Sequence, residues 1–259
     1  MKKVIYTCLV GKYDELMQPK VVDTSYDYIC FSNDFVEQNI GVWKIRKIPF
    51  DHPDKTRLSR YVKFFPNKVL AEYEYSVWLD ANLRIQTENF YKSIERQISC
   101  GNLIAQIPHV LPPIDCIYDE IKYAFKLTRI SFRDARKQYK HLKQDGFPSH
   151  YGLFENNIIA RFHNDLLVKK ISEDWWREYM AFSKRDQFSL MYVYWKNSYT
   201  PSLIFGSKEN SRNSTCIEYV PHKRILSKIT PLTIVKSLKK NTIKGFKLVL
   251  NSILVHFIG

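Results

Sequence analysis

Short apolar runs alternate with longer amphipathic stretches over the first 110 residues of this chain. The apolar runs are rich in Val, Ile, Tyr and Phe and predict strands at residues 4–10, 26–32, 42–48, 75–79 and 103–107. The amphipathic stretches predict helices at 55–65 and 90–99. Strands that alternate with helices favour an α/β fold, in which crossover helices cover the faces of a sheet.

The pattern changes after residue 110. A densely charged zone at about 117–144 predicts helix, an apolar segment at 152–162 predicts a further strand, and a Trp- and Tyr-rich stretch at 166–196 predicts a pair of helices. Leu232–Ile258 has apolar residues separated by lysines, which is a basic amphipathic pattern. We therefore predict one α/β domain over residues 1–222 and a basic C-terminal segment over 223–259.

The predicted strand at 75–79 is followed by a polar pair, Asp80 and Asn82, that stands between two apolar runs. Residues i and i+2 of an extended segment project to the same side, so we expect both side chains to point at one spot. A carboxylate and an amide oxygen suit a hard divalent cation, Mn²⁺ or Mg²⁺. Ligands of open α/β sheets collect at such strand ends. The alternative is a plain turn, where Asp and Asn are favoured.

Three cations on the helix before this strand suggest a phosphate site. Arg60 and Lys63 are three residues apart and share a helix face, and Arg57 lies one turn earlier. Arginine forms bidentate contacts with phosphate oxygens, so the group predicts a clamp for a nucleotide diphosphate. An ordinary solvated helix face is the alternative.

Later residues supply further candidates. His222 is a possible third metal ligand, with Lys223 near the diphosphate; an isolated loop histidine is the alternative. Asp186 and Gln187 open a helix-like stretch and are placed to bind a sugar, unless Asp186 only caps that helix.

Polar residues at the start of the predicted strand 152–162 are a further sign of a site. Glu155 and Asn156 enter a buried strand, which is costly unless their side chains are paired or functional. We assign them to the sugar or acceptor side, together with Asp115, which begins an acidic cluster in which any one carboxylate is a candidate base.

Composition and charge narrow the class of protein. The five cysteines are scattered and include no CxxC pair, which predicts reduced thiols and neither a disulfide framework nor a zinc site. The net charge is +14, and residues 219–259 hold eight basic residues and no acid. Charge concentrated in one segment argues against nucleic acid and predicts contact with an anionic membrane surface, although a terminal helix packed on the body is the alternative.

The lengths of the apolar runs indicate where the protein is located. The first apolar run is too short for a secretory signal, and no run has the roughly 20 apolar residues that span a bilayer. The expected location is therefore cytoplasmic, at the inner face of the membrane.

An ordered set of short motifs resembles the glycosyltransferase-like family named after plant mucilage and turgor proteins. These motifs extend from about residue 4 to 195: Tyr6-Thr7 to Tyr13-Asp14, Asp27-Tyr28 to Phe31-Ser32, Ser59–Lys63, Trp78–Asn82, Asp115–Glu120, Glu155–Asn157 and Arg185–Gln187.

The resemblance implies a GT-A fold and a metal-dependent nucleotide-sugar donor, UDP-linked, held by Asp80 and Asn82. It adds Thr7, Tyr13 and Asp27 to the donor side and implies transfer to a glycan or lipid-linked acceptor during surface polysaccharide synthesis. The Asp-Gln pair at 186–187 is similar to one in retaining transferases of the lipooligosaccharide galactosyltransferase type.

One motif departs from the family pattern, and two other functions compete with sugar transfer. Pro112-Pro113-Ile114 stands where a basic residue is expected near the acidic cluster. A sugar-phosphate nucleotidyltransferase is disfavoured, because no Gly-rich loop follows the first strand. The other competitor is a non-enzymatic basic protein that binds nucleic acid or anionic lipid.

Overall fold

A computed structural model of the chain describes residues 1–11, 15–109, 114–221, 245 and 247–259. Ten strands are present in this part of the chain: β1 (Lys3–Cys8), β2 (Tyr26–Phe31), β3 (Asn39–Ile40), β4 (Trp43–Arg46), β5 (Tyr75–Leu79), β6 (Leu83–Ile85), β7 (Ile104–Pro108), β8 (Phe154–Arg161), β9 (Ser202–Leu203) and β10 (Ile217–Tyr219).

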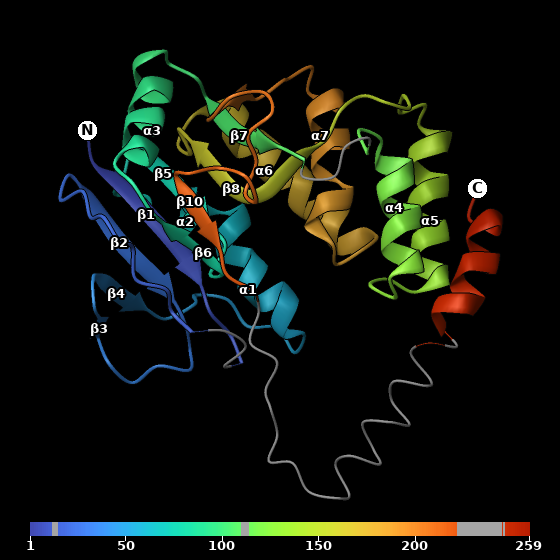
Figure 1. Cartoon of the computed structure of the whole chain (residues 1–259), viewed down its shortest axis with the longest axis horizontal. Coiled ribbons are helices and arrows are strands. Elements are labelled where there is room, and N and C mark those ends of the chain that lie inside the picture. Colours follow the sequence, from blue (N-terminus) through green and yellow to red (C-terminus); the bar gives the residue numbers. More distant parts are fainter. Residues whose placement is uncertain (12–14, 110–113, 222–244, 246) are drawn as a thin grey trace, which may run out of the picture.

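The helices of the described residues flank these strands (Figure 1). They are α1 (Lys55–Phe64), α2 (Pro66–Val69), α3 (Asn89–Ser99), α4 (Ile117–Lys126), α5 (Phe132–Gln144), α6 (Leu166–Ala181) and α7 (Leu190–Lys196), with the 3₁₀ turns η1 (Asp186–Phe188) and η2 (Val255–Phe257).

Eight strands form one mixed sheet in the order β3-β4-β2-β1-β5-β8-β7-β9. Strands β4, β2, β1 and β5 are parallel, whereas β8 is antiparallel to both β5 and β7. β6 pairs with β10 in a separate two-stranded ribbon. The predicted α/β fold, a mixed sheet flanked by helices, is confirmed. The parallel half brings the carboxyl ends of β1 and β5 to one edge.

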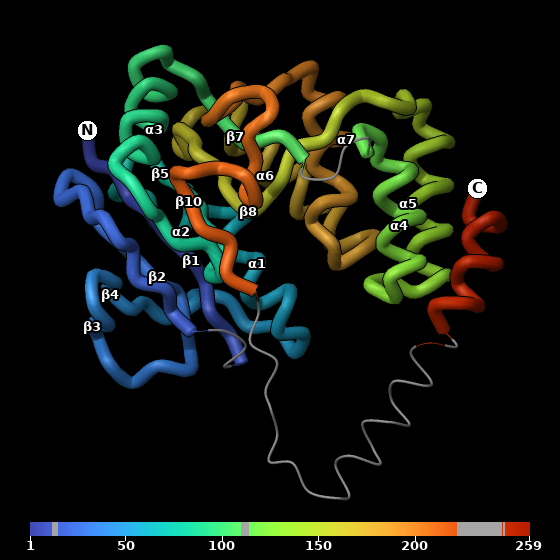
Figure 2. Tube along the Cα trace, in the orientation of Figure 1, coloured from blue at the N-terminus to red at the C-terminus, as the bar shows by residue number. Residues whose placement is uncertain are grey.

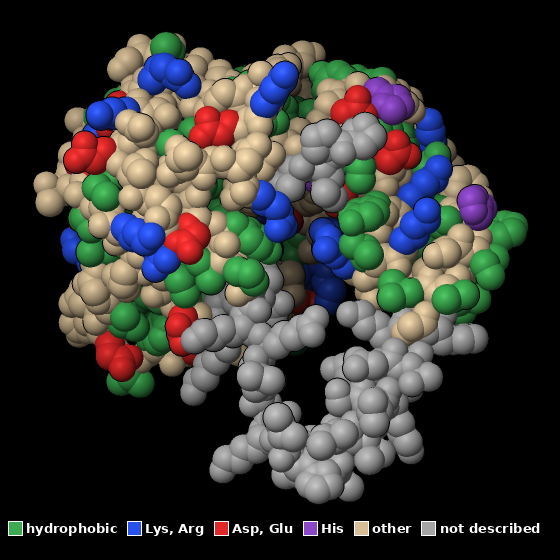
Figure 3. Space-filling view, viewed as in Figure 1, with side chains coloured by type: hydrophobic (Ala, Val, Ile, Leu, Met, Phe, Trp, Pro, Cys, Tyr) green, Lys and Arg blue, Asp and Glu red, His purple; other side chains and the backbone are tan. Residues whose placement is uncertain are grey.

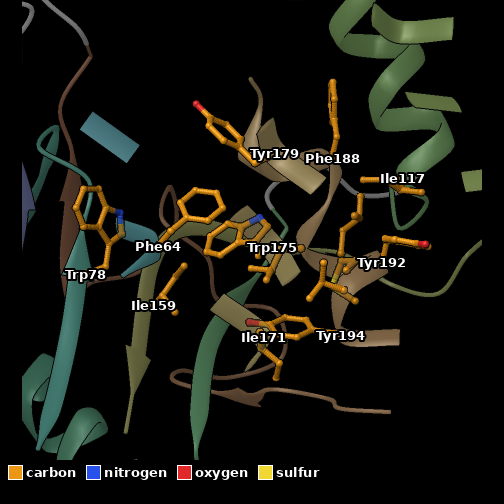
Figure 4. Close-up of a cluster of buried hydrophobic side chains, with 14 of the residues drawn as sticks. Phe64, Trp78, Ile117, Ile159, Ile171, Trp175, Tyr179, Phe188, Tyr192 and Tyr194 are labelled. Atoms are coloured by element: carbon orange, nitrogen blue, oxygen red, sulfur yellow. The ribbon is translucent and has the colours of Figure 1, made fainter. Parts of the chain in front are cut away.

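Alternate residues of the central strands fill two cores. Tyr6 and Trp78 face one side of the sheet and pack with residues of α1, α6 and α7, whereas Ile5 and Val77 face the other side and pack with α3. Figure 4 shows the first core, where Phe64 of α1 stacks on Trp175 of α6 with ring centroids 3.8 Å apart. This period-two alternation explains why both faces of the sheet need a helical cover.

Local sequence sets the helix ends. Asp54 caps α1 by accepting hydrogen bonds from the backbone N–H groups of Thr56 and Arg57, and Pro66 follows shortly after its end. The charged zone predicted as one helical region is two helices, because Ser131 caps α5 after a turn in which Thr128 has a positive φ of 57°.

The C-terminal residues return to the body of the protein. Residues 247–254 are helical, and Asn251 donates a hydrogen bond of 2.8 Å to the carbonyl oxygen of Phe125 in α4. Val255 and Ile258 are buried, and the red segment lies beside α4 and α5 in Figure 2. Packing on the body, the alternative that the sequence left open, therefore holds for this end. The proposed boundary at 222/223 falls outside the described residues and stays a prediction.

Two other expectations concern membranes and thiols. In the described part of the chain, no helix is long and apolar enough to cross a membrane. All five cysteines are free, and four of them are buried. Burial raises the pKa of the Cys30 thiol to about 12, so this thiol stays protonated and inert at neutral pH.

The stacked pair in the first core predicts a large stability effect. Phe64→Ala should lower the free energy of unfolding by about 3–5 kcal/mol, because it leaves a cavity against Trp175. Leu166→Ala is the matched control, since Leu166 is 83% exposed, and should change the same quantity by less than about 0.5 kcal/mol. Urea unfolding followed by circular dichroism measures both, and equal losses would contradict this account of the core.

Candidate functional site

Two cavities lie at the carboxyl edge of the parallel strands. The first, of about 500 Å³, is lined by residues that follow β1, by α1 and by the end of β5. The second, of about 670 Å³, lies between the sheet, α4 and η1. Thr56, Arg60 and Asp80 line both cavities, so the two are neighbours that meet at this point. Figure 3 shows basic side chains around the hollow between the sheet half and the α4–α5 half.

Asp80 and Asn82 both line the first cavity, but not in the way that the sequence predicted. The expectation was an extended segment, and the structure has a turn, because the N–H of Leu83 donates to the carbonyl oxygen of Asp80 at 2.9 Å. The Asp80 N–H is held by the carbonyl oxygen of Asn157 at 2.8 Å. The turn, rather than strand alternation, brings both side chains to one cavity.

These two side chains fit part of a metal shell. Oδ1 of Asp80 accepts a hydrogen bond from the indole of Trp78 at 2.7 Å and lies 3.5 Å from Nζ of Lys63. Asn82 donates through its amide nitrogen to the carbonyl oxygen of Val220, which leaves its amide oxygen available as a ligand. One carboxylate and one amide oxygen suit Mg²⁺ or Mn²⁺ that a diphosphate also holds.

Three predicted site residues lie outside the described residues: Tyr13, His222 and Lys223. The described chain leaves the site next to Asn82, since the N–H of Val220 donates to the Asn82 carbonyl oxygen at 2.8 Å. The roles assigned to these three residues stay predictions.

Lys63 is not the free phosphate clamp that we expected. Its side chain is 1% exposed, and its ammonium lies 2.5 Å from Oδ2 of Asp186. Arg60 also faces Asp186, with Nε 3.3 Å from the same oxygen, but it lines both cavities. Arg57 lines neither cavity. Lys63 lines the second cavity but is paired with Asp186, so Arg60 is the member of the predicted three-cation clamp that lines both cavities.

The ionic cluster fixes the charge state of Asp186. Burial opposes ionisation of this carboxyl, but Lys63 and Arg60 overcome that effect and hold its pKa well below its usual range. Its side chain does not cap η1, so the alternative of a helix cap is also wrong. Asp186 is thus an ionised partner of two cations.

The polar residues predicted for the sugar side do line the second cavity. Gln187 donates to the carbonyl oxygen of Phe154 at 2.7 Å. Glu155 accepts a hydrogen bond from Asn157, and burial raises its pKa. Asn156 is held through its amide oxygen by Gln106 at 3.1 Å. These bonds position the three side chains at the wall of one cavity.

The second cavity is also lined by buried polar atoms that form no hydrogen bond within the described residues. They are Arg60 Nε, His109 Nδ1, Glu120 Oε2, Asn156 Nδ2, Asn157 Oδ1 and Arg185 Nε. A buried polar atom without a partner costs about 1–3 kcal/mol. Six of them around one cavity provide the hydrogen-bonding capacity that a polar ligand such as a sugar requires.

Three further predicted site residues line neither cavity. Thr7 is buried within β1 and lines neither cavity. Asp27 is at the amino end of β2, away from the carboxyl edge, where it pairs with Lys44 and Tyr73. Asp115 also lines neither cavity and is bonded to Nδ1 of His150 at 2.7 Å.

Sequence reasoning missed part of the second cavity and one cluster beside it. Arg129 and Arg212 line the cavity although no motif marks them. Near Asp115, ligand atoms of Cys116, Asp119 and His150 lie within 4.8 Å of one another, a grouping that scattered cysteines had not suggested. Only the fold brings residues 116 and 150 together.

Two neighbouring polar cavities at the carboxyl edge of an α/β sheet are where ligands of such folds bind. The chain belongs to the TOD1/MUCI70, glycosyltransferase-like domain family, whose model matches residues 1–218. This is the glycosyltransferase-like family that the motifs predicted. Among curated proteins, none matches the chain.

Two solved structures are similar to this chain at low identity. One is described as "WbbM bifunctional glycosytransferase apo structure", with 10% identity, a TM-score of 0.42, and coverage of 78% of this chain and 38% of that one. The other is mouse xyloside xylosyltransferase 1 in its apo form, with 8% identity, a TM-score of 0.44, and coverage of 78% and 84%. The chain thus spans well under half of the first structure's length.

Removing Asp186 should destabilise the protein strongly. Asp186→Ala leaves the buried ammonium of Lys63 without its 2.5 Å partner, so we expect a loss of about 3–5 kcal/mol in the free energy of unfolding. Glu72→Ala breaks the exposed pair with Arg46 and should cost less than about 1 kcal/mol. The double variant Lys63→Met/Asp186→Leu should recover much of the loss. Urea unfolding of the three variants tests this, and a stable single variant would refute the buried-pair argument.

Proposed function

We propose that this protein transfers a sugar from a nucleotide-diphosphate donor, UDP-linked, to a glycan or lipid-linked acceptor in surface polysaccharide synthesis. The donor nucleotide occupies the first cavity, and the sugar and acceptor occupy the second. The observation that carries this proposal is the meeting of the two cavities at Asp80, Arg60 and Thr56. A diphosphate in the first cavity directs its sugar across this junction.

The residues at the junction suit the departure of a diphosphate. Asp80 and Asn82 would hold Mg²⁺ or Mn²⁺, which neutralises charge on the leaving group. Arg60 lines both cavities and offers a guanidinium to the phosphate oxygens. Asp186 contacts Arg60 and Lys63 and holds both cations in place before the substrate arrives. Such preorganised charge is a large part of catalysis in general.

The carboxylates of the second cavity have different roles in this proposal. Asp186 is a poor proton acceptor, because two cations hold its pKa low. Burial raises the pKa values of Glu155 and Glu120, which brings both closer to the range in which a carboxylate exchanges a proton with a hydroxyl. Gln187 and Asn156 would orient the sugar and the acceptor by hydrogen bonds.

We propose further that the enzyme works at the inner face of the membrane, held there by its C-terminal segment. Supporting this, Val249, Leu250, Ile253 and Phe257 are 40–65% exposed and form one apolar face of the terminal helix. The neighbouring α5 is basic, with Arg133, Arg136, Lys137, Lys140 and Lys143 against a single acid, Asp134. An apolar helix face beside basic side chains suits an anionic bilayer.

The donor site is tested by the metal dependence of nucleotide binding. Calorimetry should show that Mn²⁺ strengthens UDP binding to the wild type at least about tenfold, and that Asp80→Ala abolishes this gain, because the carboxylate ligand is gone. Asp27→Ala, at the amino end of the sheet, is the control and should behave as the wild type. A metal-dependent gain that survives in Asp80→Ala would refute the assigned metal site, and no nucleotide binding in the wild type would refute the donor cavity.

The membrane proposal is tested with vesicles. Ile253→Ser/Phe257→Ser should weaken co-sedimentation with phosphatidylglycerol vesicles at least about tenfold, since each buried apolar side chain contributes about 1.5–3 kcal/mol. Leu166 is also an exposed apolar residue but is far from this helix in sequence, so Leu166→Ser should leave vesicle binding unchanged. Equal binding of all three proteins, or no preference for anionic over zwitterionic vesicles, would contradict the assignment.

A further inference from the structure

Two arginines of the second cavity have no role in the transfer described above. Arg129 lies in the turn between α4 and α5, and Arg185 directly precedes η1. Both line the second cavity and neither lines the first. They therefore lie in the cavity assigned to the acceptor, whereas Arg60 and Asp80 line both cavities.

The charge around these arginines is incompletely balanced. Two carboxylates act on Arg185: Asp186, which Lys63 and Arg60 already engage, and Glu120, which lies 3.9 Å away and is thus too far for a hydrogen bond. His109 lies 3.8 Å from the other oxygen of the same carboxylate. Within the described residues, no ion pair or side-chain hydrogen bond engages the guanidinium of Arg129. Glu120, at a distance, is thus the carboxylate that acts on both guanidinium groups, while Asp186 is shared with Lys63 and Arg60.

Burial makes this imbalance significant. Glu120 is 5% exposed, and its Oε2 forms no hydrogen bond in the described structure. Nε of Arg185 is also buried without a hydrogen bond. Burial lowers the pKa of Arg185 although Asp186 and Glu120 oppose the shift, and the like charge of Arg129 adds to it. An anion between the two arginines would relieve the repulsion and satisfy the free N–H group.

The other cations of this cavity are engaged elsewhere. Lys184 pairs with Asp54 at 3.0 Å, and the guanidinium of Arg212 lies over the ring of Tyr219 at 4.1 Å. Lys63 and Arg60 face Asp186. The capacity to bind an additional anion is therefore concentrated at Arg129 and Arg185.

We infer that the acceptor carries a phosphate group, which Arg129 and Arg185 bind in the second cavity. This inference rests on the proposed sugar transfer. A phosphate suits the pair better than a carboxylate does, because it has enough oxygens to accept hydrogen bonds from two guanidinium groups at once. The phosphate belongs either to a terminal monoester on a sugar or to a diester that links a sugar to a lipid.

Soluble probes test the inference with the donor site already filled. In the presence of saturating UDP and Mg²⁺, ligand-observed NMR should show that glucose 1-phosphate binds at least about tenfold more tightly than glucose, as a charge-assisted hydrogen bond implies. Arg129→Ala should remove this gain, and Arg129→Lys should restore part of it. Arg133→Ala, an exposed arginine of α5 that lines neither cavity, is the matched control and should keep the gain.

The outcomes separate this inference from the proposed function. A second probe, glucose 1-phosphate esterified with octanol, distinguishes the two phosphate sources. If this diester binds as tightly as the monoester or more tightly, the phosphate belongs to a lipid-linked acceptor. No gain for either phosphate over glucose, or equal losses in Arg129→Ala and Arg133→Ala, would overturn the inference while UDP binding in the same samples keeps the donor cavity intact. Loss of UDP binding in the wild type would instead refute the sugar transfer and leave phosphate binding at Arg129 measurable on its own.

Discussion

The buried ion pair between Lys63 and Asp186 is the contact on which the site depends. The ammonium of Lys63 connects the end of α1 to Asp186 in η1. It also lies 3.5 Å from Oδ1 of Asp80, which follows β5. The backbone carbonyl oxygen of Lys63 accepts hydrogen bonds from Arg161 of β8 and Tyr6 of β1. Residues more than a hundred positions apart in sequence are thus held at one point. Replacing one partner of such a pair leaves an uncompensated buried charge, so the five elements depend on one another.

This arrangement also separates positive charge that holds the protein together from positive charge that is available to a ligand. Lys63 is fully committed to the structure, whereas Arg60, one helical turn earlier, faces the same carboxylate at 3.3 Å and still lines both cavities. Because Lys63 and Arg60 keep the Asp186 carboxylate ionised, the charges around it need not rearrange when a diphosphate binds. The same reasoning explains why Asp186, which lies near the junction, acts through the cations and not as a base.

The sequence supported the fold better than it supported the individual site residues. The strands at the centre of the sheet are short apolar runs between turns, and this local pattern predicted β1, β2, β5 and β7 to within two or three residues. Strands β3 and β9 have two residues each, too few to show any periodicity, and they were missed. The division between α4 and α5 was missed as well, because charge density hid the cap at Ser131.

The site residues show a clearer limit. Asp80, Gln187 and Glu155 were found because each follows or enters an apolar strand or helix, where a polar residue needs a reason. Lys63 was misread because helical periodicity places it on the same face as Arg60 but does not say which cation is covered by α6 and η1. Arg129 was missed for the opposite reason: it stands in a turn, and turns carry no information about the distant segment that they face.

In the proposed transfer, the two cavities would keep two charged substrates apart. A donor diphosphate is attracted to Arg60 and to a cation at Asp80, and both lie where the cavities meet. Arg129 and Arg185 lie only in the second cavity, with Glu120 and Asp186 among the side chains around them. Asp186 and Glu120 offset part of the positive charge of Arg185, so the positive charge around the second cavity is interrupted by carboxylates. A single uninterrupted basic groove would bind both phosphates more tightly, but it would not fix which sugar hydroxyl faces the donor.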